Sequence, residues 1–417
     1  MGLGYIGLPT AVTLVNHGVN VHGVDINQGI INSIKNRSIH IEEKGLKEQL
    51  LQAVDTGHFT VSTKPESADV FIIAVPSPIN PDKTADLTYV REATKSIVPF
   101  LKKGNLVILE STVPPKTVEH IMLSVLENTG FSIGTDILVA HSPERVIPGR
   151  VLQELIHNDR IVGGINHESS LAAKELYEIF VKGNIHLTDA TTAELVKVME
   201  NTYRDVNIAF ANELAKICEK LNVNVWEAID LANYHPRVNI HKPGPGVGGH
   251  CIAVDPWFLV ELQPDLANII HLSRDTNDSM PAFSVNKVKN ILGEHQIING
   301  RVAVLGLAFK ANIDDIRESP SLRVIDYLEK NNINYSVYDP HVKSNIVNYQ
   351  SESLQEAVEH ADIILILTEH DEFKKLKPDT IGELMRSKLV LDTKNCINRK
   401  VWEKAGFEVS LLGDSKK

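Results

Sequence analysis

Short apolar runs and helical patterns alternate along the first half of the chain. The runs read VNVHGVD (19–25), DVFIIAVPSP (69–78), NLVILEST (105–112) and DILVAHSPE (136–144), and each ends in residues typical of turns. Because they lack period-two alternation, they predict strands buried on both faces of a parallel sheet. The segment 9–17 has helical periodicity, with Pro9 suited to the first turn and Gly18 to the position after the last. The alternation predicts a doubly wound α/β domain.

The last third of the chain repeats this pattern. RVAVLGLAFK (301–310) and NYSVYDP (334–340) predict strands, and SLRVIDYLEKN (321–331) predicts a helix. The stretch HADIILILTEH resembles SADVFIIAVPS, and KLVLDTKN resembles NLVILEST. Two explanations stay open: two similar domains, or the shared composition of buried strands. Either way, the pattern predicts a second α/β domain of Rossmann type.

A long helix is expected between the two halves. Residues 191–223 contain neither Pro nor Gly, and their apolar residues recur at intervals of three and four. About 30 residues would extend roughly 45 Å at 1.5 Å per residue. Such a helix can join two domains and offer a face to a second subunit, although an ordinary core helix is the alternative. We therefore predict two doubly wound Rossmann-like domains joined by a long central helix and an all-α middle domain.

Composition narrows the function classes. The chain has 43% hydrophobic and 23% charged residues with a net charge of −11, which argues against a general nucleic-acid binder. Its apolar runs are shorter than the ~18 residues of a membrane span, and its start lacks the features of a signal peptide. The cysteines Cys218, Cys251 and Cys396 show no C-x-x-C spacing, which argues against disulfides and a cysteine zinc site. The expected setting is cytoplasmic, without membrane or nucleic acid as a partner.

The chain opens on a glycine fingerprint. Gly2, Gly4 and Gly7 form G-x-G-x-x-G directly before a helical pattern, and Asp25 ends the next predicted strand. Such glycines allow a pyrophosphate to approach a helix N-terminus, and the acidic residue favours NAD over NADP. The fingerprint ordinarily follows a strand, but only Met1 precedes it here. We expect a start codon assigned too late or a missing first strand, and a literal sequence would leave a gap that weakens the sheet and NAD binding.

The stretch GVGGHCIAVD (246–255) places Cys251 after bare backbone and before Asp255. Glycines let a ligand approach, and a thiol at the start of a helical turn has a lowered pKa. The alternative is that Cys251 is a small buried residue of the core without a chemical role. A metal is a further alternative, because His235, His241 and His250 lie nearby in sequence. Their spacing is not that of paired ligands on a helix, so we predict no metal.

Several basic residues and one amide are candidates for binding an anion. Lys197 and Asn201 share one face of the long helix, with Arg204 beside them, and can hold an oxyanion. Exposed Lys and Asn are, however, common on helices. Lys310 and Arg317 lie where the second domain would have its phosphate loop, and a solvated charge pair is the alternative there.

Seven motifs together resemble one known family. In their order and spacing, these motifs resemble those of the UDP-glucose/UDP-mannose dehydrogenase superfamily. They are GLGYIGLPTA, VPSPI, ESTVPP, HSPERVIPG, AELVKVMENTYRDVN, PGPGVGGHCIAVDP and VLGLAFKANIDDIRESPS. The resemblance implies an NAD-binding domain at 1–187, a helical dimerisation domain with the Cys251 loop at 188–292, and a UDP-sugar-binding domain at 293–417. It also implies a homodimer through the central helix.

The resemblance implies a four-electron oxidation of a C6 alcohol to a carboxylate by two NAD⁺, through a thiohemiacetal and a thioester on Cys251. HSPERVIPGRVLQELIHNDRIVGG and NYHPRVNIHKPGPGVGGHC favour UDP-N-acetyl-D-mannosamine, whose uronate serves bacterial surface polysaccharides such as capsule. Alternatives are a 6-dehydrogenase for UDP-GlcNAc, UDP-GalNAc or UDP-glucose, and a truncated, inactive nucleotide-binding protein. A hydroxyacid-type dehydrogenase would need no Cys251 and would form one NADH.

The resemblance also assigns residue roles. Lys197 and Asn201 would hold the alkoxide and thiohemiacetal oxygen, and Asp255 a water. Glu144 would assist thioester hydrolysis, and Thr112 would lie near the nicotinamide. NAD contacts would come from Gly2, Gly4, Tyr5, Ile6, Gly7, Asp25, Ser77, Thr112 and Arg317. The UDP-sugar would meet Arg145, Val146, Lys197, Asn201, Arg204, His235, Arg237, Gly244, Lys310 and Lys394, with Arg237 able to reach the neighbouring subunit's site.

Two positions depart from the family's usual residues. Ser77 stands where relatives often have Thr, which keeps the hydroxyl. Lys394 stands where UDP-glucose enzymes usually have Arg, and Lys cannot offer a two-pronged fork. The second departure also fits a different sugar.

Overall fold

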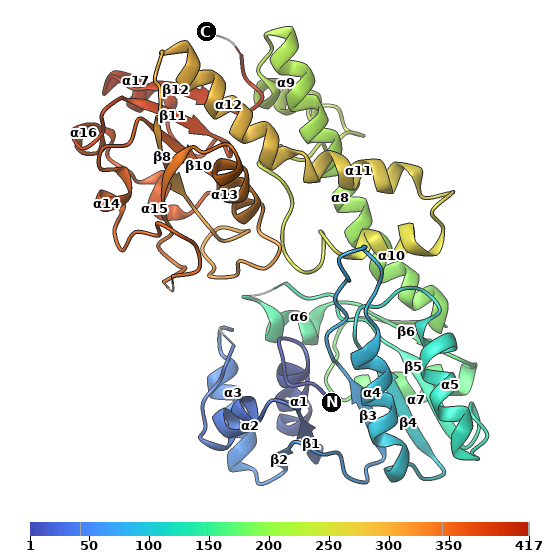
Figure 1. Ribbon diagram of the computed structural model, residues 1–417. Helices are drawn as coiled ribbons and strands as arrows, with labels where there is room; N and C mark the ends of the chain where they lie inside the picture. Colours follow the sequence, from blue (N-terminus) through green and yellow to red (C-terminus); the bar gives the residue numbers. More distant parts are fainter. Residues whose placement is uncertain (42, 148, 344, 416–417) are drawn as a thin grey trace. The chain divides into compact units, whose positions relative to one another are not determined.

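The structure is a computed structural model that describes residues 1–41, 43–147, 149–343 and 345–415. The chain forms two compact units. The first consists of Met1–Glu200 and Trp257–Pro264, and the second of Asn201–Pro256 and Asp265–Lys417. Helix α8 (Ala190–Leu221) has 32 residues and runs from the first unit into the second (Figure 1). The predicted long helix is confirmed.

The main sheet of the first unit has the strand order β3-β4-β5-β6-β7. Its strands are β3 (Val70–Ile73), β4 (Asn105–Leu109), β5 (Ile137–His141), β6 (Arg160–Gly164) and β7 (Ile185–Asp189). The predicted strands β3, β4 and β5 pair in parallel, as do β6 and β7, whereas β6, which was not among the predicted strands, is antiparallel to β5. An antiparallel pair needs no crossover helix on one face, and the connection between these strands carries only the short helix α6 (Val151–His157).

Side chains from β4 alternate between two cores. Val107 and Leu109 face helix α4 (Thr88–Ile97) and the segment formed by η2 (Val118–Met122), α5 (Leu123–Leu126) and η3 (Glu127–Thr129). Leu106 and Ile108 face the core that includes α6 and α7 (His167–Tyr177). The short turn η1 (Val98–Phe100) follows α4. All five residues of β4 are buried, as its uninterrupted apolar run predicts.

A second, two-stranded sheet pairs β1 (Val21–Val24) with β2 (Phe59–Ser62). Residues 1–3 lie between β1 and β3: the Gly2 N–H donates to the Val24 carbonyl, and the Ala74 N–H to the Met1 carbonyl, each at 2.8 Å. A cavity of about 200 Å³ lies beside them, lined in part by Leu14, Val21 and Ile72. The sheet is therefore interrupted at the position where the sequence predicts a gap.

Three helices cover the small sheet. They are α1 (Gly7–Asn16), α2 (Gln28–Lys35) and α3 (Leu46–Asp55). Their buried leucines and isoleucines pack with Leu3 and Phe59 into one core. Gly18 follows α1 with φ of +88°, the left-handed conformation that the sequence predicts just past this helix.

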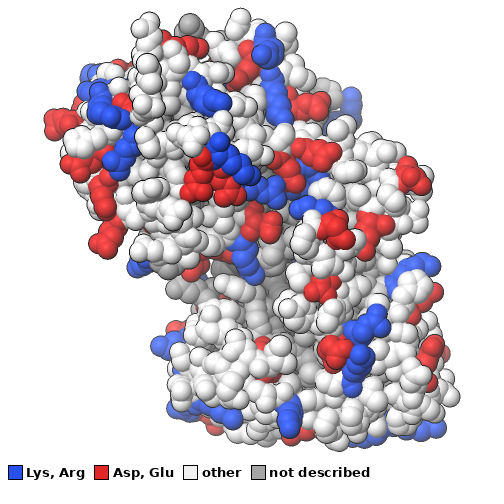
Figure 2. Space-filling view, viewed as in Figure 1, with Lys and Arg blue, Asp and Glu red and all other residues white. Residues whose placement is uncertain are grey.

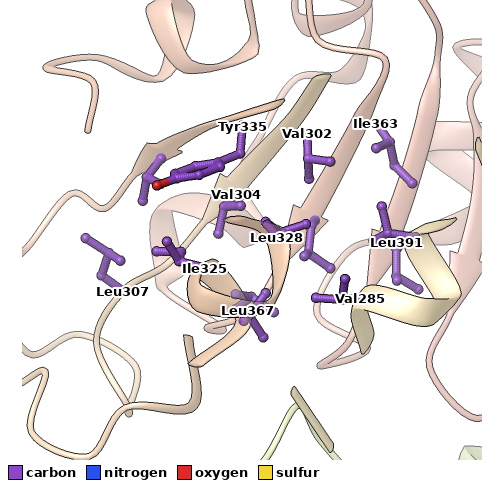
Figure 3. Packing of buried hydrophobic residues seen from close by; sticks show 14 of the residues in the cluster. Val285, Val302, Val304, Leu307, Ile325, Leu328, Tyr335, Ile363, Leu367 and Leu391 are labelled. Atoms are coloured by element: carbon purple, nitrogen blue, oxygen red, sulfur yellow. The ribbon is translucent and has the colours of Figure 1, made fainter. Parts of the chain in front are cut away.

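The second unit contains a five-stranded parallel sheet with the order β12-β11-β10-β8-β9. Its strands are β8 (Arg301–Leu305), β9 (Asn334–Tyr338), β10 (Ile363–Ile366), β11 (Leu389–Asp392) and β12 (Glu408–Leu411). Val302 and Val304 pack with Val285, Ile325 and Leu328 on one face (Figure 3). The opposite core includes alternate side chains of the same strands. This alternation confirms a doubly wound second sheet.

Helices surround this sheet and extend from it. Near it lie α12 (Met280–Glu294), α13 (Pro320–Lys330), α14 (Leu354–Val358), α15 (Asp371–Lys374), α16 (Pro378–Gly382) and α17 (Arg399–Lys404). Between α8 and α12 along the chain lie the helices α9 (Val225–Ala232), α10 (Asp255–Leu262) and α11 (Asn268–Asp278). The two compact units are a coarser division than the three domains predicted with boundaries at 187 and 292, and that division stays a prediction.

The charges on the surface and the apolar character of the helices also bear on the sequence predictions. On the face drawn in Figure 2, Lys and Arg side chains are interspersed with Asp and Glu. Among the residues that the structure describes, none of the helices combines the length and the apolar character that crossing a membrane requires.

Candidate active site

The glycine fingerprint forms a tight turn into α1. A Cβ on Gly2, which has φ of +84°, would lie 2.4 Å from the Ala74 carbonyl oxygen, and one on Gly7 would lie 1.9 Å from that of Gly2. A Cβ on Gly4 would meet no described atom within 4 Å. The N-cap residue Ile6 supplies no side-chain bond to the first turn. The turn therefore combines close packing at Gly2 and Gly7 with open space at Gly4, which fits a pyrophosphate at a helix N-terminus.

Asp25 follows β1 and faces this turn. Its Oδ2 accepts the Leu3 N–H at 2.9 Å, and its Oδ1 accepts the Asn27 N–H at 2.8 Å. The side chain remains partly exposed. Tyr5, in the fingerprint turn, is partly buried against the small core beneath α1. The predicted cofactor residues at this end of the chain are thus brought together.

Ser77 and Thr112 also meet. They follow the neighbouring strands β3 and β4, and the Ser77 hydroxyl donates to the Thr112 carbonyl. Because ligands bind at the carboxyl edge of such sheets, this contact lies where a cofactor would be expected.

Glu144 and Arg145 follow β5. Glu144 is 9% exposed, and its Oε1 accepts the Arg145 N–H at 2.7 Å. Its Oε2 contacts the guanidinium of buried Arg160, a residue that the sequence analysis did not single out. The Arg145 side chain pairs with Glu200 on α8, with Nη2 to Oε1 at 2.6 Å. Val146 follows in the same loop and is partly buried.

Asn201 and Asp255 form a buried pair in the second unit. The Asn201 amide donates to Asp255 Oδ2 at 2.6 Å, and the two residues are 7% and 2% exposed. Asn201 lies on α8, four residues after Lys197 and on the same helix face. The family resemblance implies separate roles for Asn201 and Asp255, and the structure joins the two side chains by a hydrogen bond.

Cys251 lies one turn before α10. Its carbonyl accepts the N–H groups of Val254 at 3.0 Å and Asp255 at 2.8 Å, so a helical turn leads from the thiol to the buried carboxylate. Cys251 is partly exposed, whereas Cys218 is buried. The alternative that Cys251 is a small core residue is therefore wrong, and Cys218 takes that place.

The glycines ahead of Cys251 are explained by close packing. The Gly244 N–H donates to Asn212 Oδ1 at 2.9 Å, and the Gly249 N–H to the Arg317 carbonyl at 3.0 Å. A Cβ on Gly248 would lie 2.7 Å from the Cβ of Phe309. The Cys251 loop is thereby held between α8 and the loop that follows β8.

Cations gather at the carboxyl edge of the second sheet. Lys310 and Arg317 lie in the loop after β8, where Lys310 is exposed and Arg317 pairs with Asp315 at 2.6 Å. Lys394 follows β11, and its Nζ lies 2.9 Å from Glu369 Oε2. It would also lie 3.6 Å from a Cβ on Gly244. The strand order reverses between β8 and β10, which is the usual place for a ligand in such a sheet.

The remaining predicted sugar contacts are exposed side chains. Arg204 lies on α8, and His235 and Arg237 follow α9. The Arg237 N–H donates to His235 Nδ1 at 3.3 Å.

Among the described residues, His341, His370 and Glu372 bring possible metal-ligand atoms within 4.8 Å of one another. His370 Nδ1, however, accepts the Asn312 N–H at 2.9 Å, and its Nε2 lies 3.1 Å from Asp339 Oδ2. Both ring nitrogens of His370 thus hold loops of the second sheet. The histidines near Cys251 that the sequence analysis considered as metal ligands, His235, His241 and His250, are not part of this group.

Family models match most of the chain. The NAD binding domain of the UDP-glucose/GDP-mannose dehydrogenase family matches residues 1–181, its central domain 191–279 and its UDP binding domain 303–399.

Named relatives are similar over their whole length. A UDP-N-acetyl-D-mannosamine dehydrogenase from Methanocaldococcus jannaschii is 51% identical over 100% of this chain and 96% of its own. An NDP-N-acetyl-D-galactosaminuronic acid dehydrogenase from Ralstonia solanacearum is 45% identical, covering 94% of each. The solved structure of a UDP-D-ManNAc dehydrogenase from Pyrococcus horikoshii has a TM-score of 0.93 at 41% identity, covering 100% of this chain and 99% of the other.

Proposed function

The chain belongs to the UDP-glucose/GDP-mannose dehydrogenase family and is an NAD-dependent sugar-nucleotide dehydrogenase, and from this premise we propose that it oxidises UDP-N-acetyl-D-mannosamine at C6 to the uronate. The observation that carries the reaction type is the turn that joins partly exposed Cys251 to the buried Asn201–Asp255 pair. A dehydrogenase that stopped at an aldehyde would need no such thiol. The names of the relatives at 51% and 41% identity support the choice of sugar.

The first oxidation removes two electrons from the C6 alcohol. NAD⁺ held at the fingerprint turn would supply the hydride acceptor in this step, and a second NAD⁺, after exchange, would supply it in the next. One N–H of the Asn201 amide is committed to Asp255, which orients the amide and leaves its second N–H for the developing alkoxide. Lys197, one turn earlier on α8, is proposed to stabilise the same oxygen and to accept the hydroxyl proton.

The second oxidation needs the thiol. An aldehyde carbon gives up a hydride readily only after a nucleophile has added to it. The Cys251 thiolate forms a C–S bond, and the resulting thiohemiacetal loses a hydride and its hydroxyl proton to become a thioester. Water then attacks the thioester, the C–S bond breaks, and the carboxylate leaves. Glu144 is proposed to accept the water's proton, and Asp255 to hold a water for this base chemistry. Overall, one alcohol, two NAD⁺ and one water yield one carboxylate, two NADH and three protons.

The charges of the second unit support binding of a nucleoside diphosphate. Lys310, Arg317 and Lys394 lie in loops at the carboxyl edge of its sheet, beside the glycines that precede Cys251. We assign the diphosphate to Lys310 and Lys394 but not to Arg317, for which the family resemblance implies an NAD contact, and we assign the NAD pyrophosphate to the fingerprint turn of the first unit. Use of the product in a surface polysaccharide stays a prediction of the family resemblance.

The stoichiometry of NADH tests the proposal. With limiting UDP-N-acetyl-D-mannosamine and excess NAD⁺, absorbance should show two NADH per sugar nucleotide. One NADH per sugar would contradict the thioester pathway. Faster turnover of UDP-GlcNAc or UDP-glucose would contradict the sugar.

Substitution of the thiol gives an independent test. Cys251→Ser should lose steady turnover while still binding the sugar nucleotide, because serine keeps the shape but is a far weaker nucleophile at neutral pH. Calorimetric titration with UDP-N-acetyl-D-mannosamine measures the binding. The buried thiol Cys218→Ser serves as the control, and it should retain turnover.

A second candidate substrate is UDP-N-acetyl-D-galactosamine. The relatives from Ralstonia named for the galactosaminuronic acid differ from the mannosamine enzymes by only a few per cent in identity to this chain. The same NADH assay with this epimer separates the two, since the preferred substrate has the higher kcat/KM.

We also propose a homodimer through α8. Tyr203, Phe210 and Ile217 are 65%, 51% and 45% exposed and recur at intervals of seven residues, followed by Leu221 at 66%. Apolar side chains at heptad spacing form one stripe along a helix and are typical of a helix–helix seam.

A further inference from the structure

Arg160 lies between two buried carboxylates of the first unit. It is the first residue of β6 and is 4% exposed. Its Nη2 contacts Glu144 Oε2, while its Nη1 lies 3.5 Å from Glu110 Oε1 and 3.1 Å from Ser142 Oγ. The guanidinium carbon is 4.1 Å from the ring centre of Tyr177. Three elements therefore hold this one cation in place.

Each carboxylate oxygen of Glu144 has its own hydrogen-bond donor. Arg160 takes Oε2, and the Arg145 backbone N–H takes Oε1 at 2.7 Å. A carboxylate whose two oxygens are held separately by a guanidinium and a backbone donor keeps one orientation. Glu144 nevertheless keeps 9% of its surface exposed, so water can reach it.

Glu110 makes a different environment on the other side of Arg160. Its side chain is fully buried, and its Oε1 accepts the Tyr177 hydroxyl at 2.7 Å. Burial raises the pKa of Glu110, whereas the Arg160 charge opposes that rise. The guanidinium contacts Glu144 more closely than Glu110, which lies 3.5 Å away, so Glu144 is the main carboxylate that Arg160 positions.

We propose that Arg160 is a positioning residue that holds the Glu144 carboxylate in one orientation as the base for thioester hydrolysis. This inference rests on the proposed function, because the step exists only if Cys251 carries the thioester. In the step, the water oxygen bonds to C6, one water proton passes to Glu144, and the other is lost to solvent as the carboxyl group ionises. The C6–S bond breaks, the sulfur leaves as the Cys251 thiolate, and Glu144 later returns its proton to solvent. No electrons are transferred.

The experiment compares Arg160→Lys with Glu144→Gln in the full chain. Lys keeps the charge but loses the fork that reaches several acceptors at once. Both variants should form two NADH per Cys251 in a fast burst and then turn over slowly, with Cys251 carrying the sugar acyl group in an intact-mass spectrum. Since general bases contribute about 10²–10⁴-fold, we expect kcat to fall by about 10- to 100-fold in Arg160→Lys. The KM for the sugar nucleotide should change by less than about threefold, because ground-state binding is not removed.

Controls separate this role from a structural one. The exposed Arg91 lies on α4, and Arg91→Gln should leave the burst and turnover unchanged. Ser142→Ala removes one contact of Arg160 while keeping every charge, and should show a smaller accumulation of acyl-enzyme. A structural defect alone would lower turnover without accumulating the acyl-enzyme.

The outcomes are distinguishable. Acyl-enzyme in Glu144→Gln but in neither Arg160→Lys nor Ser142→Ala would overturn the role of Arg160 and leave the proposed function intact. No acyl-enzyme in Glu144→Gln would overturn the base assignment itself. One NADH per sugar in the unaltered protein would remove the thioester and with it both proposals.

Discussion

At the scale of single residues, buried ionisable side chains connect elements of this fold at positions that the sequence analysis did not single out. Glu194 near the start of α8 is fully buried and accepts the N–H groups of Lys116 at 2.5 Å and Val118 at 2.8 Å. Burial raises the pKa of Glu194 to about 8. This carboxyl therefore ties α8 to the start of η2 and makes the attachment sensitive to pH.

The pH dependence of stability should report this group. Because its pKa is raised in the folded state, Glu194 binds a proton that the unfolded chain has lost between about pH 4.5 and 8. Its contribution is complete below about pH 4.5 and declines as the pH rises through 8, with a slope of up to about 1.4 kcal/mol per pH unit. Glu194→Gln should flatten the fall of Tm over this range in circular dichroism melts. Parallel Tm curves for both proteins would contradict the assignment.

The candidate catalytic side chains were singled out from short motifs and the family resemblance, and their roles stay predictions. Cys251 follows glycines, and Asn201 follows Lys197 by one helical turn. Arg160 and Glu110 were not, because a charged residue beside an apolar run looks like an exposed strand end. Only the packing of β4, β5 and β6 shows that both are buried and paired.

At the scale of elements, a polar network fixes the Cys251 loop. Asn212 on α8 accepts the Gly244 N–H at 2.9 Å and donates to Asn277 on α11 at 2.8 Å. Asn277 in turn donates to Asp205 at 2.8 Å, and buried Arg274 donates to the same carboxylate at 2.5 Å. The helices thus impose the position of the loop through buried hydrogen bonds, whose loss is costly.

Removal of Asn212 should loosen this loop. Asn212→Ala leaves the Gly244 N–H and the Asn277 amide oxygen without these partners, which should lower the free energy of unfolding by about 1–3 kcal/mol per buried group. Urea titration measures this change, and the rate of Cys251 alkylation by iodoacetamide reports the loop. Asn207→Ala on the same helix is the control, because its side chain bonds only to an exposed carbonyl there and should cost less. Equal losses in both variants would contradict the network's role.

At the scale of the whole molecule, each Rossmann-like unit has its own set of ligand-binding features. The first has the fingerprint turn with open space at Gly4, and the second has cations after β8 and β11. A division of labour between cofactor and sugar nucleotide follows from these two different edges.

Lys310 tests this division. Lys310→Ala removes an exposed cation from the loop after β8 and should raise the KM for the sugar nucleotide by about tenfold, the equivalent of about 1.4 kcal/mol. The KM for NAD⁺ should change little. Initial rates with each substrate varied in turn give both constants, and equal increases would count against placing the diphosphate in the second unit.

The exposed stripe on α8 makes a prediction for assembly. Phe210→Glu places a charge in the apolar stripe and should convert a dimer to a monomer at micromolar concentration, as measured by sedimentation velocity. Ile298 is 87% exposed outside α8, so Ile298→Glu is a matched control that should leave the assembly unchanged. A monomer in the unaltered protein would contradict the proposed interface.

Local patterns were enough to predict the buried strands, the 32-residue helix, the fingerprint turn and the Cys251 motif, because each depends on residues close together along the chain. The antiparallel β5–β6 pair was not predictable, since strand direction depends on how the connection returns to the sheet. The same holds for the Asn201–Asp255 bond and the Arg160 cluster, whose partners lie 54 and up to 50 positions apart. Such contacts exist only once the sheets have packed, because burial then forces each charge and amide to find a partner.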